Sequence, residues 1–475
     1  MKRIISFLLI GLIAIAHLAS APLALARPVV IDVAVLRALN QPLRDQPLDV
    51  IVTLRDQLDV SQLDRSTVPD QLQRHAVSAQ SDLLALLRAQ PPNQVLSVTS
   101  LWIDNAIALS ASRQVILDLA QRTDVARIQL DATVQLPERA APAPLAANLA
   151  SINASAAWQR GVTGQGVVVA ILDSGVDLAN ADLKAKWRGG SNSWFDPYGE
   201  HDTPADLSGH GTEVLGVILG GNDETGSPIG VAPGAQWIAA KIFNDRGRAS
   251  QSAIHRALQW VLDPDGNPAT PDAPQVVNNS WSSANPGCST DFTADLQALR
   301  AAGILPIFAA GTNVPIGPAN TPDAFAVGAL ENDSILLLDS AHGPSSCLNT
   351  NLVYPQLVAP GADIHTTERS GAFTDATGTS LAAAHVSGAL ALLLSAHPKL
   401  SAADQAGLLM NTAVDLGARG PDNDFGYGRL DIAALIDRAA PTTPTPQIIL
   451  IAGGSALISL IAALHLFRRR MPNKK

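Results

Sequence analysis

The sequence predicts an α/β domain with a doubly wound, mostly parallel β-sheet. Short apolar runs rich in β-branched residues alternate with helical patterns, which is typical of parallel strands buried on both faces. With 475 residues, 47% of them hydrophobic, the chain can bury a large core. In this fold class, functional sites lie beyond the carboxyl ends of the strands. The predicted strands are Val167–Leu172, Trp237–Phe243, Gln275–Asn279 and Ile304–Ala310, and the predicted helices are His210–Leu219, Ser250–Leu262 and Asp291–Ala302.

A small α+β unit is predicted in front of this domain, within residues 27–136. Its element order, β-α-β-β-α-β, is that of a ferredoxin-like, split βαβ fold. The expected elements are a strand at Leu48–Leu54, a helix at His75–Arg88, two strands within Leu96–Leu109, a helix at Arg113–Arg122 and a strand at Ala126–Leu130. Residues 137–150 follow as an Ala- and Pro-rich linker, which predicts an exposed site for proteolysis.

Both ends of the chain resemble targeting segments. Lys2 and Arg3 precede an apolar run that closes in an A-x-A pattern, which predicts a signal peptide over residues 1–26; an uncleaved anchor is the alternative. A Pro/Thr linker at 439–447 leads to an apolar run at 448–467, long enough to span about 30 Å as a transmembrane helix. The basic tail at 468–475 would stay in the cytoplasm. We therefore expect an exported, membrane-anchored domain, with a buried soluble helix or a removed sorting tail as the alternatives for 448–467.

Charge and cysteine content narrow the function classes. The formal net charge is -10, and there is no basic run outside the two ends, which argues against a nucleic-acid partner. The only two cysteines are Cys288 and Cys347. In an exported chain such a pair favours a disulfide over two free thiols, and two thiols alone do not make a metal site.

Three residues suggest nucleophilic catalysis. Ser380 comes two positions after Gly378 and opens an Ala/Leu-rich helical run, although a lone serine there also suits a helix N-cap. Asp173 directly follows a predicted strand, where a turn residue is the alternative, and His210 starts a predicted helix between two glycines. A serine needs a base with a pKa near 7, and a buried carboxylate orients that base. His385 lies five positions after Ser380, so it faces away and is expected to be structural.

Four motifs together resemble the subtilisin-like serine proteases, or subtilases, closest to the bacillopeptidase F branch: ILDSGVD at 171–177, SGHGT at 208–212, IGVAPG at 229–234 and GTSL at 378–381. The resemblance covers residues 151–438. It implies a serine endopeptidase with Asp173, His210 and Ser380 as the triad and no cofactor required for the chemistry.

The resemblance also assigns roles outside the triad. Ser280, Trp281 and Ser282 match the strand that binds extended peptide substrates and forms one wall of the S1 pocket. Residues 27–136 are similar to an inhibitory propeptide, with self-cleavage expected between Leu136 and Ser151. The implied partners are therefore protein or peptide substrates, the chain's own propeptide and the membrane.

One departure from the family pattern concerns the oxyanion site. Thr312 follows Ala309–Gly311 where the family places an asparagine, and Asn313 comes one residue later. Either side chain would complete the site, and our interpretation slightly favours Asn313; a merely structural turn is the alternative. Loss of this donor would favour a second function, a peptide-binding scaffold with impaired catalysis. The complete triad favours an active enzyme over the scaffold. An enzyme that processes only itself and one partner is a third hypothesis.

Other departures from the family pattern, and the acidic loops, are weaker evidence about function. Glu213 replaces a histidine, Ala384 a proline, and Ser282 a glycine of the family pattern. Subtilases often bind structural calcium, and hard oxygen ligands are offered by Asp182, Asn222, Asp223 and Glu224, but no ligand spacing identifies a site. His201, Asp202 and Asp206 lie in a Pro/Gly-rich loop and are expected to be solvated.

Overall fold

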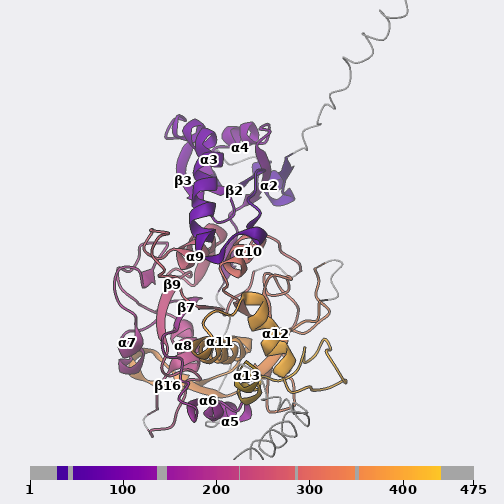
Figure 1. Ribbon diagram of the computed structural model, residues 1–475. Helices are drawn as coiled ribbons and strands as arrows, with labels where there is room; N and C mark the ends of the chain where they lie inside the picture. Colours follow the sequence, from indigo (N-terminus) through magenta and orange to yellow (C-terminus); the bar gives the residue numbers. More distant parts are fainter. Residues whose placement is uncertain are drawn as a thin grey trace, which may run out of the picture.

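The computed structural model describes residues 29–40, 46–135, 147–223, 225–283, 287–347 and 352–439. The predicted signal peptide at 1–26 lies outside the described residues, as does most of the linker at 137–150. The same holds for the predicted transmembrane helix at 448–467 and the basic tail at 468–475. Two bodies are visible, a small N-terminal unit and a larger domain beneath it (Figure 1).

A seven-stranded, fully parallel sheet forms the centre of the larger domain, as predicted. Its strand order is β14-β13-β12-β11-β7-β9-β8. The strands are β7 (Val168–Asp173), β8 (Trp194–Phe195), β9 (Gln236–Lys241), β11 (Val276–Asn279), β12 (Pro306–Ala309), β13 (Phe325–Leu330) and β14 (Leu357–Pro360). Every residue of the four central strands β7, β9, β11 and β12 except Val168 and Gln236 is buried, which accounts for their continuous apolar character.

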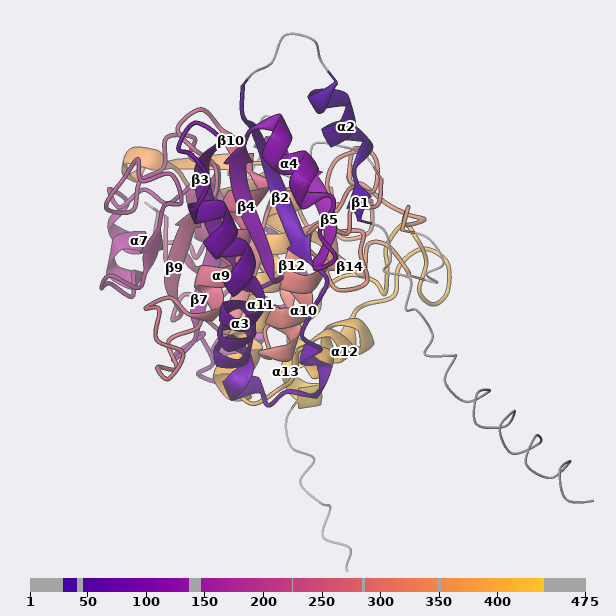
Figure 2. The same cartoon turned by 90° about the horizontal axis from the view of Figure 1, so that it is seen from above.

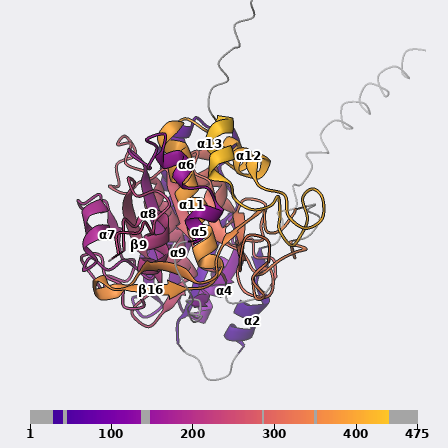
Figure 3. The ribbon, with the colours of Figure 1, turned by 90° about the horizontal axis from the view of Figure 1, so that it is seen from below.

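Helices cover both faces of this sheet. Helices α8 (His210–Leu219) and α11 (Thr379–Ala396) pack on one face, and α9 (Gln251–Leu262) and α10 (Thr293–Ala301) pack on the other. Among the described residues, α11 is the one helix long and apolar enough to cross a membrane, but 89% of it is buried inside the domain. It is therefore the central core helix. Figure 3 shows it from below, where α13 (Ile432–Ala439) packs against it, and α6 (Ser155–Trp158) and α12 (Ala402–Thr412) pack against α13.

The N-terminal unit has its own sheet and its own apolar core. The strand order is β1-β5-β2-β4-β3, with β1 parallel to β5 and the remaining pairs antiparallel. The elements are β1 (Val30–Ile31), α2 (Val33–Leu39), β2 (Leu48–Leu54), α3 (Val68–Arg88), β3 (Val95–Leu101), β4 (Ala106–Ala111), α4 (Arg113–Leu119) and β5 (Val125–Leu130). From β2 to β5 they follow the predicted order, although α3 starts seven residues before the expected His75.

The N-terminal unit lies over α9 and α10 (Figure 2). The backbone N–H of Trp102 donates to Gln259 Oε1 at 2.8 Å, and Arg127 forms an ion pair with Asp291 at 2.9 Å. After β5 the chain continues as β6 (Thr133–Gln135), which pairs antiparallel with β10 (Arg248–Ser250) of the larger domain. Val68, Leu72 and Ile103 also share a buried apolar cluster with side chains of α9 and α10. Apolar packing, polar contacts and one strand pairing thus hold the two bodies together.

The remaining elements surround the central sheet. A short hairpin is formed by β15 (Ile364–Thr367) and β16 (Phe373–Ala376), and two short helices are α5 (Ala147–Ser151) and α7 (Ala181–Lys186). Cys288 and Cys347 form a disulfide, as expected from the sequence. The bond closes a loop with a sequence separation of 59 residues.

Candidate active site

The three predicted catalytic residues lie at the ends of three core elements. Asp173 is the last residue of β7, His210 is the first residue of α8 and Ser380 is the second residue of α11. The N-cap of α11 is Gly378, so the interpretation of Ser380 as an N-cap is wrong. Its hydroxyl group lies instead in the first turn, at the positive end of the helix dipole.

These side chains form a continuous chain of hydrogen bonds. His210 Nδ1 lies 2.7 Å from Asp173 Oδ1, and His210 Nε2 lies 3.1 Å from Ser380 Oγ. The carboxylate favours the tautomer with a proton on Nδ1, which leaves Nε2 to accept the serine proton. Burial lowers the pKa of His210, but the charge and hydrogen bond of Asp173, together with the charges of Glu213 and Asp206, outweigh burial, so the pKa is raised above its ordinary value. The arrangement can generate a serine nucleophile.

Buried polar side chains hold Ser380 from the sheet side. Ser280 Oγ donates to the backbone oxygen of Ser380 at 3.2 Å and accepts from Asn278 Nδ2 at 3.0 Å. Ser387 Oγ, about two turns further along α11, donates to Asn278 Oδ1 at 2.8 Å. Since all of these residues lie in the core, the network fixes the register of α11 against β11.

A cavity of about 490 Å³ opens over Ser380 and His210. The predicted wall residues Ser280, Trp281 and Ser282 all line it. Trp281 is only 1% exposed because its ring packs edge to face against two phenylalanine rings of the core. This volume lies within the range of pockets that bind small ligands or single side chains.

The two oxyanion candidates lie in different surroundings. Thr312 lines the cavity, whereas Asn313 is absent from its lining. Asn313 is exposed with a φ of 64°, and its backbone N–H donates to Asp339 O at 2.7 Å. The N–H of Gly311 donates to Thr379 Oγ1 at 3.2 Å, which ties this loop to the first turn of α11. The placement favours Thr312 over Asn313, against the sequence-based interpretation.

Comparison with known proteins supports the same chemistry. Residues 164–428 match the model of the subtilase family. The chain is 33% identical to bacillopeptidase F of Bacillus subtilis (strain 168) over 405 residues, which are 77% of this chain and 28% of that protein. It is 31% identical to subtilisin E of the same strain over 332 residues, or 68% and 78% of the two chains. It is 32% identical to an alkaline protease of Shouchella clausii over 320 residues, or 66% and 76%.

The chain belongs to the subtilase family of serine peptidases. The resemblance expected from the four motifs is therefore confirmed. The aligned region spans little more than a quarter of bacillopeptidase F, but about three quarters of subtilisin E and of the alkaline protease.

In this subtilase, Asp206 positions His210. The expectation that Asp206 is solvated is wrong, since it is 8% exposed. Its carboxylate accepts five hydrogen bonds, from Ser174 Oγ, the N–H groups of Ser208, Gly209 and Thr212, and Thr212 Oγ1. These donors surround the start of α8, so Asp206 holds the turn that carries His210. The only sequence signal is an acidic residue four positions before a helix start.

Two glycines around His210 meet a steric demand. Gly209 adopts a φ of 92°, a conformation that other residues rarely adopt. At Gly211, an added Cβ would lie 2.1 Å from the backbone oxygen of Gly175. The close approach of α8 to the loop after β7 is what brings His210 to Asp173.

His385 and Glu213 have separate roles in this subtilase. His385 is fully buried, its Nδ1 bonds to Leu381 O at 2.8 Å, and burial lowers its pKa to about 4, as suits the expected structural role. Glu213 is 2% exposed, lines the cavity, and its charge adds to that of Asp173 in raising the pKa of His210.

The residues considered for calcium are bonded to protein groups. Asp182 pairs with Lys186 at 3.0 Å and accepts from Gly221 N–H, and Asp223 accepts from Thr225 and Ser227 N–H at 2.8 and 2.9 Å. Glu224 lies outside the described residues. A different acidic group, Asp263, Asp265 and Asp272, brings one oxygen from each carboxylate within 4.8 Å of one another.

Proposed function

We propose that this subtilase is a serine endopeptidase that hydrolyses peptide bonds through an acyl-enzyme on Ser380. His210 Nε2 takes the serine proton as Oγ attacks the carbonyl carbon, and then gives it to the leaving amine. Water repeats the sequence to release the acid. Asp173 holds the tautomer and stabilises the imidazolium. The observation that carries the proposal is the buried chain of contacts at 2.7 and 3.1 Å beneath a cavity of substrate size.

The developing oxyanion would be stabilised by the backbone N–H of Ser380 and the hydroxyl group of Thr312. Thr312 is the candidate side chain that lines the cavity with Ser380. The side chain of threonine is shorter than that of asparagine, so its hydroxyl donor lies closer to the backbone. All groups that this chemistry needs are thus supplied by the protein. Structural calcium remains part of the proposal only as a stabiliser of the fold.

We further propose that residues 27–136 act as an inhibitory propeptide. Gln135, the last residue of β6, lines the catalytic cavity together with Ser380 and Ser282. Through its pairing with β10, β6 occupies the larger domain as an extended peptide would. Self-cleavage between Leu136 and Ser151 would leave this segment as the first inhibitor of the mature enzyme.

The cellular setting belongs to the same proposal. Export through residues 1–26 and anchoring through 448–467, with the basic tail at 468–475 in the cytoplasm, would present the active site outside the cell. Protein or peptide substrates would then be extracytoplasmic. The sequence features at the two ends support this placement.

Labelling with a fluorophosphonate separates the enzyme from the rival peptide-binding scaffold. The full chain and its Ser380→Ala variant are treated with the probe and with a chromogenic peptide, and labelled residues are located by peptide mass. We expect one label, on Ser380, and peptide turnover only in the parent chain. A processed chain that binds peptides but shows neither labelling nor turnover would establish the scaffold.

A further inference from the structure

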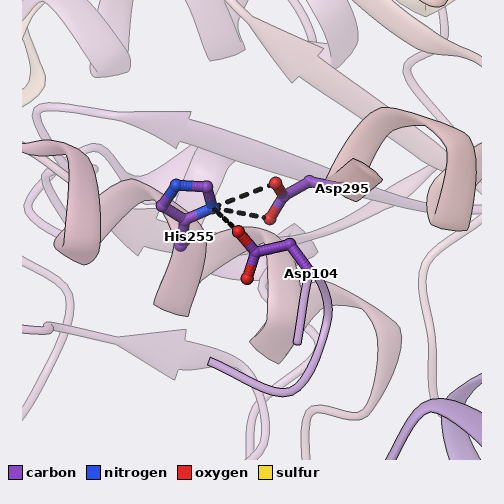
Figure 4. A group of neighbouring side chains, drawn as sticks. All are labelled: Asp104, His255 and Asp295. Carbon is purple, nitrogen blue, oxygen red and sulfur yellow. Dashed lines mark hydrogen bonds and ion pairs between the residues drawn. The ribbon is translucent and has the colours of Figure 1, made fainter. Parts of the chain in front are cut away.

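The contact between the N-terminal unit and the catalytic domain contains a buried charged group that the peptidase chemistry does not use. Asp104 comes from the turn between β3 and β4, His255 from α9 and Asp295 from α10 (Figure 4). They are 6%, 0% and 0% exposed. His255 Nδ1 lies 2.9 Å from Asp295 Oδ2 and 3.9 Å from Asp104 Oδ2. The imidazole therefore faces one carboxylate from each body.

The charges in this group do not balance unless protons are bound. With one proton on each ring nitrogen of His255, the three side chains carry a net charge of -1; one more proton, on Asp104, makes the group neutral. Asp104 Oδ1 and His255 Nε2 are buried and have no hydrogen-bond partner among the described residues. Asp131, another residue of the N-terminal unit, also acts on His255 electrostatically and increases the negative potential. A buried site of this kind favours proton uptake.

The titration of both partners shifts in the same sense when the two bodies are joined. Burial raises the pKa of Asp104 to about 7, although the charge of His255 opposes burial. Burial opposes protonation of His255, but the charges of Asp295 and Asp104 outweigh it and raise its pKa to about 9. In solvent, ordinary values are about 3.9 for aspartate and about 6.5 for histidine. Separation exposes Asp104 and takes its charge away from His255, so the joined state binds more protons than the separated state.

We propose that Asp104, His255 and Asp295 form a proton-operated latch that docks the N-terminal unit at acidic pH and releases it as the pH rises. The direction of the pH dependence follows from the linkage between proton binding and docking. Both groups bind protons more tightly when docked, so docking is strongest below their solvent pKa values and weakens as pH rises through about 7 and then about 9. The consequence for activity rests on the proposed function, because release would clear Gln135 from the cavity.

Two other carboxylates lie at this interface: Asp131 accepts from Ser252 and Asp263 accepts from Gln73, and burial raises the pKa of each. The remaining polar contacts do not add to this pH dependence. The bond from Trp102 N–H to Gln259 and that from Gln251 N–H to the backbone oxygen of Ala132 involve no group that titrates. Arg127 and Asp291 form an ion pair at 2.9 Å. Asp104 also lines a cavity of about 300 Å³ between the two bodies, so the latch lies at the edge of that cavity. Asp104 is the member of the latch that leaves with the N-terminal unit.

Hydrogen–deuterium exchange of the full chain in detergent tests the latch without requiring catalysis. Ser380→Ala keeps the two bodies in one polypeptide, and EDTA removes divalent cations. The reporters are the amides of Trp102 and of Gln251, whose N–H groups bond across the interface. Exchange is corrected for its intrinsic rate at pH 6.0, 7.5 and 9.0. We expect protection of these amides to fall about tenfold or more from pH 6.0 to 9.0, while protection in α11 stays constant.

Asp104→Asn mimics the protonated carboxyl group with little change in shape. In that background we expect protection of the same amides to change by less than about threefold over the pH range. Asp82→Asn, at an exposed position of α3, is the matched control and should follow the parent. Parent protection that does not change with pH, or an Asp104→Asn profile as steep as the parent's, would overturn the latch. So would added Zn²⁺ that restores protection at pH 9.0, since a metal ion would then replace the proton. If the chain with Ser380 intact shows neither fluorophosphonate labelling nor peptide turnover, while exchange in the Ser380→Ala chain still follows pH, the proposed function would be overturned and the latch would stand.

Discussion

Two aspartates hold His210, and each has a different task. Asp173 accepts from the imidazole itself at 2.7 Å and fixes the tautomer. Asp206 has no hydrogen bond to the ring; it accepts hydrogen bonds from backbone N–H groups around the start of α8. The first carboxylate sets the chemistry of the base and the second sets its position.

Substitution of Asp206 should therefore destabilise the fold. In Asp206→Asn, the amide group presents N–H donors to other donors, so some of the five hydrogen bonds are lost in a buried site. We expect the free energy of unfolding to fall by about 2–3 kcal/mol. Denaturant unfolding in the Ser380→Ala background, which prevents autolysis, measures the change. Asp202→Asn, four residues away and exposed, is the control and should leave stability unchanged.

The pH dependence of activity should follow His210. The base must be neutral to accept the serine proton, so activity is lost as pH falls through its pKa. Because Asp173 raises that pKa, we expect the acid limb of kcat/KM to have its midpoint above about 6.5. Asp173→Asn should move the midpoint to lower pH and lower kcat on the order of 10⁴-fold. A limb that is unchanged in this variant would show that another group titrates.

The oxyanion assignment is testable with two variants. Thr312→Val keeps the shape but removes the hydroxyl donor, and we expect kcat to fall about 100-fold or more with KM nearly unchanged. Asn313→Ala should retain most of the activity, because Asn313 does not line the cavity. The reverse pattern in steady-state kinetics would assign the role to Asn313.

At the scale of elements, the sequence predicted the helices and strands whose hydrophobic pattern is distinctive. Helix α8 has the predicted bounds, and both ends of β7, β9, β11 and β12 lie within two residues of the predicted strands. The strands β13 and β14 were missed: both are short, fully buried runs, and their apolar residues show no alternation that separates strand from loop. The meeting of Asp173, His210 and Ser380 was predictable because strand ends and helix starts gather at one edge of a parallel sheet.

The disulfide joins Cys288 and Cys347, which both lie outside the helices and strands that the structure describes. For a sequence separation of 59 residues, loss of the bond should lower the free energy of unfolding by about 4 kcal/mol in the chain-entropy model. The double variant Cys288→Ser/Cys347→Ser, unfolded by denaturant in the Ser380→Ala background, tests this value. Equal stability with and without the bond would show that the unfolded chain gains little freedom.

At the scale of the whole molecule, contacts between distant segments were beyond the sequence patterns. The turn before His210 depends on how five donors converge on Asp206, and a polar loop residue looks the same in sequence whether it is solvated or buried. The latch joins positions 104, 255 and 295, and β6 pairs with a strand more than 100 residues away. Such pairings depend on how the two bodies dock, which local propensity does not encode.

The most direct test of the proposed function is self-processing by Ser380. The full chain and its Ser380→Ala variant are expressed with export, and their intact masses and N-terminal sequences are determined. We predict that the parent begins between Leu136 and Ser151 while the variant keeps the N-terminal unit attached. If both chains remain joined, or if both are cut at the same place, Ser380 does not process its own chain and the account of this subtilase as an autoprocessed peptidase is contradicted.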